Sequence, residues 1–165
     1  MTGIVLSQYA VNHGPAYQGM IVDGELANIV SKLNTDVATI PYGTAVFRDP
    51  ANDGAAKAPT KASTADQFVG VAVRELNRAY HSNAVMGAVV NRDFSVLTLG
   101  VIYGTVLEAV KPGDPVYVRV GATGAGNFCK TAGADATLSV AIPGAIFTST
   151  AAANSLAKVS FVVGG

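Results

Sequence analysis

The sequence predicts an all-β protein, a single-domain antiparallel β-barrel or sandwich of about ten short strands with an extended N-terminal arm. Half of the 165 residues are hydrophobic, 18 are glycine and only 13% are charged, a composition typical of close-packed strands and tight turns. Apolar residues alternate with a period of two in short runs bounded by Gly, Pro, Asn and Asp. The length suits one domain that buries its core without metals or disulfides.

The N-terminal end has a different character. Residues 1–22 contain no Asp, Glu, Lys or Arg, and His13-Gly14-Pro15 interrupts any periodicity. We therefore expect an extended arm over residues 1–16 and the β-barrel domain over residues 17–165. Such an arm either covers an edge of its own barrel or reaches a neighbouring subunit, and the residues leave both open.

The stretch at 96–120 is expected to organise the domain as a hairpin. Its first strand, to residue 107, has apolar residues at both parities, which predicts burial of both faces, and Gly100 and Gly104 suggest bulges or bends. Residues 111–114, Lys-Pro-Gly-Asp, predict a type II turn with Gly113 at the position that needs a positive φ. The second strand begins at Pro115.

The remaining segments are assigned by the same rules. Residues 48–65 lack large apolar side chains and predict a surface loop, and residues 75–81 a short helical turn. The glycine-rich stretch 121–127 lacks a lysine and a following helix, so it predicts a hairpin loop rather than a phosphate-binding loop. Further strands are expected at 28–33, 40–47, 68–74, 85–90, 94–99, 128–131, 141–148 and 156–163.

Charge and hydropathy exclude several classes of protein. Eleven basic and eleven acidic residues cancel, so there is no basic stripe for nucleic acid or anionic lipid. No secretory signal is indicated, and the charge-poor run at 136–157 is broken by Pro143 and Gly144, so no membrane span is expected. The single cysteine, Cys129, excludes an internal disulfide and is expected to be inert packing. The redox compartment stays open, with assembly in the cytosol favoured.

No pattern predicts catalysis, a cofactor or a metal. His13 and His81 lie apart in loop-like contexts, and none of the common zinc, redox or nucleophile motifs occurs. Asn52-Asp53-Gly54 lacks the alternating acidic ligands of a calcium loop and predicts an Asx turn. The other carboxylates fall at turns, where Asp serves to turn the backbone: Asp23, Glu25, Asp36, Asp49 and Asp66. The physics of the sequence thus predicts the fold class but no function.

Several segments, taken in order and spacing, resemble the structural cement proteins that decorate the capsids of tailed bacteriophages. They are Y-x-G at 17–19 followed by Asp23, IPYGxxV at 40–46, FVGVAVR at 68–74, VKPGDPVYV at 110–118 and IPGAI at 142–146. The resemblance implies a virion protein on the outer surface of the capsid that binds the major capsid protein and stabilises contacts between capsomers. It further implies a homotrimer at capsomer junctions, and no catalytic residue.

A small β-barrel binding module, carbohydrate-binding or adhesin-like, is the alternative. Such a module needs exposed aromatic side chains in one place, whereas Tyr9, Tyr17, Tyr42, Tyr80, Tyr103 and Tyr117 are scattered. This favours the cement protein. Because a net charge of zero gives no long-range attraction to a shell, we expect apolar side chains and main-chain pairing of the arm to make the contact. The expected partner-binding residues are Ile4, Val5, Leu6 and Tyr9.

Overall fold

The computed structural model describes residues 16–22, 26–75 and 86–161, and these form an almost all-β domain, as predicted. The longest helix among the described residues is a three-residue 3₁₀ turn. The strands are β1 Asn28–Asn34, β2 Ile40–Pro41, β3 Ala45–Asp49, β4 Asn52–Lys57, β5 Phe68–Ala72, β6 Gly87–Ala88, β7 Asp93–Val106, β8 Pro115–Arg119, β9 Phe128–Cys129, β10 Ser139–Phe147 and β11 Ser155–Phe161; the 3₁₀ turns are η1 Ala65–Gln67 and η3 Asp135–Thr137.

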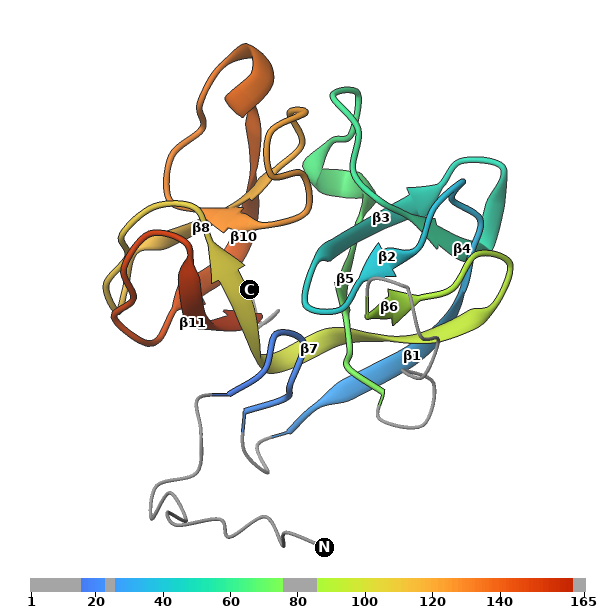
Figure 1. Cartoon of the computed structure of the whole chain (residues 1–165), viewed down its shortest axis with the longest axis horizontal. Helices are drawn as coiled ribbons and strands as arrows, with labels where there is room; N and C mark the ends of the chain where they lie inside the picture. Colours follow the sequence, from blue (N-terminus) through green and yellow to red (C-terminus); the bar gives the residue numbers. More distant parts are fainter. Residues whose placement is uncertain (1–15, 23–25, 76–85, 162–165) are drawn as a thin grey trace, which may run out of the picture.

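Two closed rings of strands share β7. The first ring runs β1-β4-β3-β5-β7 and returns to β1, and the second runs β7-β11-β10-β8-β9 and returns to β7. Figure 1 shows them as two lobes, with β7 crossing from the right lobe into the left one. Most neighbours are antiparallel, but each ring also contains one short parallel contact, β1 with β4 and β7 with β9. Closure leaves few open sheet edges.

β7 changes its partners at Gly100. Residues before it pair with β1 and β5, and Gly100 to Val106 pair with β11. Gly100 has φ +129°, so the predicted bend is confirmed there, and the β1 register skips Thr98 as a bulge does. The prediction that both faces are buried is confirmed only at Val96 and Leu97.

Farther along β7, the burial alternates. Ile102, Gly104 and Val106 face the inside of the second ring and are buried, whereas Val101 and Tyr103 on the other face are half-buried. A strand in the wall of a barrel has one inner and one outer face, and this accounts for the difference.

The predicted hairpin between β7 and β8 is wrong, although its turn is confirmed. The Asp114 N–H donates to the Lys111 carbonyl over 3.1 Å, and Gly113 has φ +90°, as a type II turn requires. However, β11 and β10 lie between β7 and β8 in the sheet order. The connection is held instead by Val110, which forms a bridge with Ala151, and by a hydrogen bond from the Gly113 N–H to Phe147.

The predicted surface loop at 48–65 contains strand β4, so that prediction is also wrong in part. Ala55 and Ala56 are fully buried, Ala56 in the apolar cluster of the first ring, and β4 pairs with β1 and with β3. The Asx turn is confirmed, since the Gly54 N–H donates to the Asn52 side chain over 2.9 Å. The loop at 121–127 is a hairpin loop between β8 and β9, as predicted. Of the predicted helical turn at 75–81, only Glu75 is described, in non-helical backbone.

The two rings have adjoining apolar cores. A smaller cluster fills the first ring and includes Val46, Ala72 and Phe94. A larger one fills the second ring and continues across the outer faces of β3 and β5. Phe68 connects the two halves, with its ring 5.8 Å from that of Phe47 and 5.6 Å from that of Phe161. The rings therefore pack as one domain.

Candidate functional site

The described part of the chain begins with a short extended segment, residues 16–22, that lies along the free side of β7. Gly19 donates to the Tyr103 carbonyl over 2.8 Å, Tyr103 donates to Met20 over 2.9 Å, and Val22 donates to Val101 over 2.9 Å. This ladder occupies the edge of β7 between β1 and β9. We call residues 16–22 the root segment; it begins at the last residue of the predicted arm.

Side chains fix the root segment further. The guanidinium of Arg74 lies 4.5 Å from the centre of the Tyr17 ring. The main-chain N–H of Arg74 donates to the Gly19 carbonyl over 2.8 Å. Gly19 has φ +79° and packs so closely on Gly43 and Tyr42 that a side chain would not fit. The Y-x-G and IPYG motifs of the sequence therefore meet here, and they hold the start of the domain rigidly.

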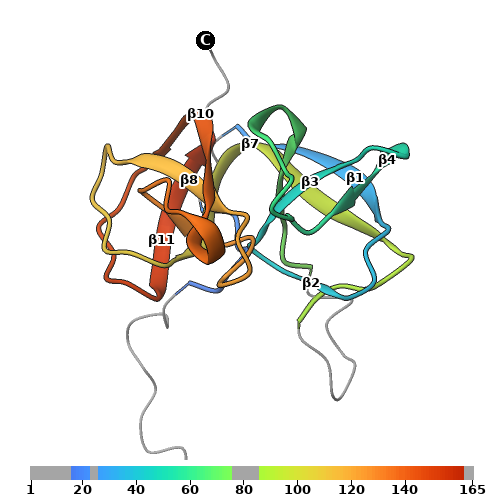
Figure 2. The ribbon, with the colours of Figure 1, turned by 90° about the horizontal axis from the view of Figure 1, so that it is seen from above.

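The predicted contact residues Ile4, Val5, Leu6 and Tyr9 lie outside the described residues, as do His13 and His81. Their role stays a prediction. The structure places the root segment, with which the predicted arm would be continuous, at the seam between the two rings (Figures 1 and 2).

No group of side chains in the described residues is arranged for catalysis or for metal binding. No three His, Cys, Asp or Glu side chains in these ranges gather closely enough to hold an ion. Cys129 is a free, buried thiol that donates to the Ser139 hydroxyl over 3.1 Å, in agreement with its predicted packing role. Arg119, also buried, donates to the same hydroxyl over 3.0 Å and faces Glu108 at 3.8 Å. These polar groups satisfy one another inside the wall of the second ring.

Asp49 is the carboxylate with the clearest electrostatic environment. It accepts the Thr35 hydroxyl over 2.7 Å and the Ala51 N–H over 3.1 Å, and Lys57 lies 3.1 Å away. These contacts, the Thr35 hydrogen bond first, hold the pKa of Asp49 below its usual value. The Asp49 carboxylate, at the end of β3, thus links the loop after β1 to β4. Its contacts stabilise the charged form, which is a structural role.

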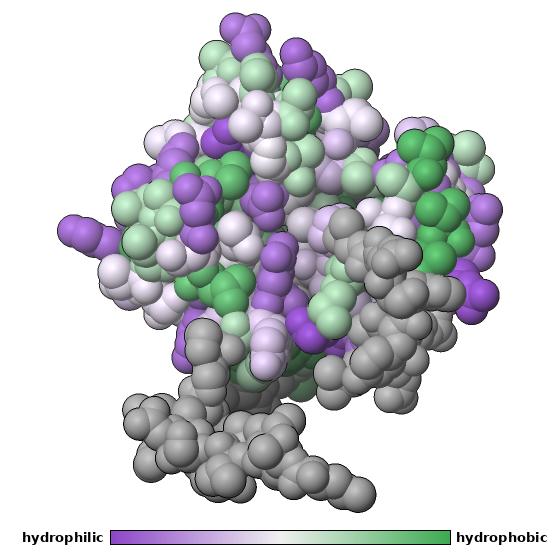
Figure 3. All heavy atoms as spheres, in the orientation of Figure 1, coloured by the Kyte–Doolittle hydropathy of each residue, from purple (hydrophilic) through white to green (hydrophobic). Residues whose placement is uncertain are grey.

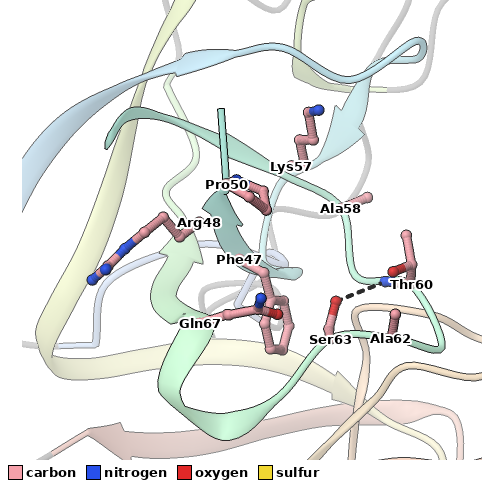
Figure 4. A pocket seen from close by; sticks show the side chains of 9 residues that line it. All are labelled: Phe47, Arg48, Pro50, Lys57, Ala58, Thr60, Ala62, Ser63 and Gln67. Carbon is pink, nitrogen blue, oxygen red and sulfur yellow. Dashed lines mark hydrogen bonds between the residues drawn. The ribbon is translucent and has the colours of Figure 1, made fainter. Parts of the chain in front are cut away.

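A small hollow of about 140 Å³ lies between β3, β4 and the loop before β5 (Figure 4). Phe47 and Gln67 are among the residues that line it, and the Ser63 hydroxyl accepts the Thr60 N–H over 3.0 Å at one side. Neither a histidine nor a carboxylate lines it. The lysine that lines it, Lys57, is paired with Asp49 at 3.1 Å.

The surface does not favour the carbohydrate-binding alternative. Among the described tyrosines only Tyr17 is largely exposed, at 62%, and Arg74 covers one face of its ring. Tyr42 is buried, and Tyr103 and Tyr117 are half-buried. On the face that Figure 3 shows, apolar side chains are interspersed with polar ones.

The described residues thus form two closed rings of strands, with the root segment hydrogen-bonded to the strand that the rings share. No helix in the described ranges is both long enough and apolar enough to cross a membrane. Among solved structures, the chain is similar to a protein in "The capsid of Myoviridae Phage XM1", with a TM-score of 0.69, 19% sequence identity, and coverage of 98% of this chain and 96% of that one. At this identity the likeness establishes the fold.

The family follows from the sequence. Residues 5–162 match the family model described as structural cement protein (E217 gp24/Pam3 gp6), so the chain belongs to the phage structural cement proteins. No curated protein sequence matches it. Its role is that of a cement protein of the capsid, and its place is the outer surface of the virion.

Proposed function

We propose that the protein binds the major capsid protein at junctions between capsomers, as a homotrimer, and that its N-terminal arm supplies a large part of the contact. The observation that carries the proposal is the root segment. Three main-chain hydrogen bonds to β7 and the Tyr17–Arg74 contact attach the start of the domain to its most central strand. A force that pulls on the arm would therefore be transmitted through β7 to both rings of strands.

The composition of the arm supports an apolar contact. Ile4, Val5, Leu6 and Tyr9 lie in a stretch without any Asp, Glu, Lys or Arg, and residues 1–16 could span at most about 50 Å when extended. Burial of these side chains, with main-chain pairing to an edge strand, would give affinity without net charge. No enzymatic activity and no nucleic-acid binding are expected of such a protein.

Self-association is proposed from the low charged fraction. With 13% charged residues, and with Tyr17, Met20 and Leu26 exposed close to the start of the domain, a monomer would leave apolar surface in water. A closed ring of three copies fits a junction of threefold symmetry and would present three arms to one shell.

Two measurements test the proposal. The purified full-length protein should co-sediment with capsids that lack it, saturating at a fixed ratio to the shell protein, and should raise the temperature at which those capsids rupture. Light scattering should give the mass of three chains, either for the free protein at micromolar concentration or for protein released from capsids. Failure to bind undecorated capsids would overturn the capsid role, and a mass of two chains would overturn the trimer alone.

A further inference from the structure

The first ring of strands is not closed over the whole length of β1. β4 pairs with β1 only at Leu33 and Asn34, which lie opposite Ala55 and Ala56. Before Leu33, the side of β1 that faces away from β7 pairs with no described strand. Residues 28–32 therefore form an open sheet edge, on the lower side of the right lobe in Figure 1.

The hydrogen bonds between β1 and β7 determine which main-chain groups of β1 point outward. The Asn34 N–H donates to the Arg92 carbonyl over 3.0 Å, so this pair is hydrogen-bonded. Bonded residues alternate along an antiparallel strand. The N–H and C=O groups of Ile29 and Ser31 therefore point away from β7, toward the open edge.

The residue opposite Ser31 supports this assignment. Ser95 of β7 is bonded on its other side, because its carbonyl accepts the Val73 N–H over 2.9 Å and its N–H donates to the Glu75 carboxylate over 3.0 Å. Within the described ranges, no strand or side chain bonds the outward main-chain groups of Ile29 and Ser31. The open edge thus leaves donors and acceptors at alternate residues without a protein partner.

The Asx turn in β4 explains why the ring opens here. A longer parallel ladder would need the Gly54 N–H for the Ser31 carbonyl. This N–H donates instead to the Asn52 side chain over 2.9 Å, and the Asp53 carbonyl accepts the Lys32 ammonium over 2.6 Å. Local hydrogen bonds on both strands therefore keep the edge open, and β4 cannot close over it without breaking the Asx turn.

The edge lacks the features that usually prevent a further strand from adding to a sheet. Natural edges carry proline, outward charges or bulges. Residues 29–33 contain no proline, their register on β7 is regular, and their one charge, Lys32, is bound to β4. Ile29 is 45% exposed and Ser31 is also exposed, so a strand could reach both. Such an unprotected edge is where an extended peptide adds to a sheet.

We propose that the open edge of β1 receives an extended, uncharged segment of the major capsid protein as an additional strand. This rests on the proposed function. A strand supplies acceptors and donors at the spacing that Ile29 and Ser31 require. Since the charge of Lys32 is already bound to β4, the added strand needs no charge of its own. A second copy of this chain fits less well, because pairing of β1 with β1 is twofold and would not close the proposed trimer.

The test removes the outward N–H of Ser31 without changing the bonds to β7. Ser31→Pro deletes this donor and places the proline ring in the way of an added strand, whereas Ser31→Ala keeps the N–H and is the matched control. Full-length Ser31→Pro should bind undecorated capsids at least tenfold more weakly than the wild type. Ser31→Ala should bind like the wild type, and both variants should keep its oligomeric mass.

A charge variant and hydrogen exchange test the same edge if the proline variant does not fold. Ile29→Lys should also weaken binding at least tenfold, because lysine at an edge hinders strand addition. In the wild type, the amide protons of Ile29 and Ser31 should exchange at least tenfold more slowly on capsids than in the free protein. Those of Val30 and Lys32, which are bonded to β7, should change less.

The outcomes separate this proposal from the function on which it rests. If the wild type fails to bind capsids, the proposed function falls and this contact falls with it. If the wild type binds, and a folded Ser31→Pro variant binds equally well or exchange at the edge is unchanged on capsids, the edge is not a contact. Equal weakening by Ser31→Ala would assign the effect to the side chain and overturn strand addition. A changed oligomeric mass of Ser31→Pro would show that the edge joins copies of this chain and not the shell.

Discussion

Gly104 of β7 lies directly against the ring of Phe128 of β9, and a Cβ at Gly104 would collide with that ring. The contact occurs where the second ring closes, next to the single pairing of β7 with β9 at Val106 and Phe128. Because Phe128 is fully buried, its ring has nowhere to move. Gly104 is thus the position at which the closing strands can approach one another.

Gly104→Ala should therefore destabilise the domain by about 1–3 kcal/mol, the usual cost of overpacking a core. At about 2–4 °C per kcal/mol for a chain of this size, the melting temperature should fall by roughly 2–12 °C in thermal denaturation followed by circular dichroism. Gly54→Ala is the control, since a Cβ there meets only the end of the Asn52 side chain, at 3.3 Å. Equal melting of the two variants would contradict the close approach.

Gly113→Val tests the type II turn by backbone strain alone. A Cβ at Gly113 would have nothing within 4 Å, so any loss comes from its φ of +90°, which costs a β-branched residue about 1–2 kcal/mol. Gly113→Asn should lose less, because asparagine tolerates positive φ. Chemical denaturation of both variants checks the order; a valine variant as stable as wild type would mean that the turn relaxes without cost.

Asp49 predicts a defined pH dependence of stability. Its pKa is lowered in the folded protein, so its contribution is present above the unfolded pKa of about 3.9 and is lost as pH falls through the lower folded value. From pH 5 downward to pH 2, the melting temperature of wild type should fall more steeply than that of Asp49→Asn. Asp53→Asn, at an exposed position of β4, should keep the wild-type slope. Parallel curves for wild type and Asp49→Asn would contradict the role of the carboxylate.

The residue types within a turn predicted the turns correctly, but they did not predict which strands pair. The sequence at 111–114 specifies its turn because proline and glycine set φ at two adjacent positions. Whether β8 then pairs with β7 depends on β10 and β11, which lie 20 to 50 residues away and compete for the same edges. The alternation of apolar and polar residues also cannot reveal that β7 passes from one ring to the other, since the parts of β7 before and after Gly100 would show the same period of two.

Small side chains also hid a buried strand. Ala55 and Ala56 carry no strand signal in the sequence, yet both are fully buried in β4, which pairs with β1 and with β3. A buried Asn34 directly before Thr-Asp could have indicated a fixed turn, but its burial depends on Ala88, which is distant in the chain.

Removal of the predicted arm should weaken capsid binding without unfolding the domain. Trimming residues 2–16 leaves Tyr17 and the Gly19 hydrogen bonds in place, so the domain should melt at nearly the wild-type temperature. The trimmed protein should nevertheless bind undecorated capsids far more weakly, because three arms held in one trimer reinforce one another by a factor that can reach 10²–10⁴. Replacing Ile4, Val5, Leu6 and Tyr9 together by serine should have the same effect at full length, whereas Gln8→Ser should not.

The salt dependence of capsid binding distinguishes an apolar interface from one held by ion pairs. Binding of the wild type should change little from about 0.1 M to 1 M salt, over which the Debye length falls from about 10 Å to 3 Å. An interface built on ion pairs would weaken across that range, whereas apolar burial would not. A trimmed protein that still saturates capsids would remove the arm from the interface, and full-length protein that washes off at 1 M salt would show that charge holds it there.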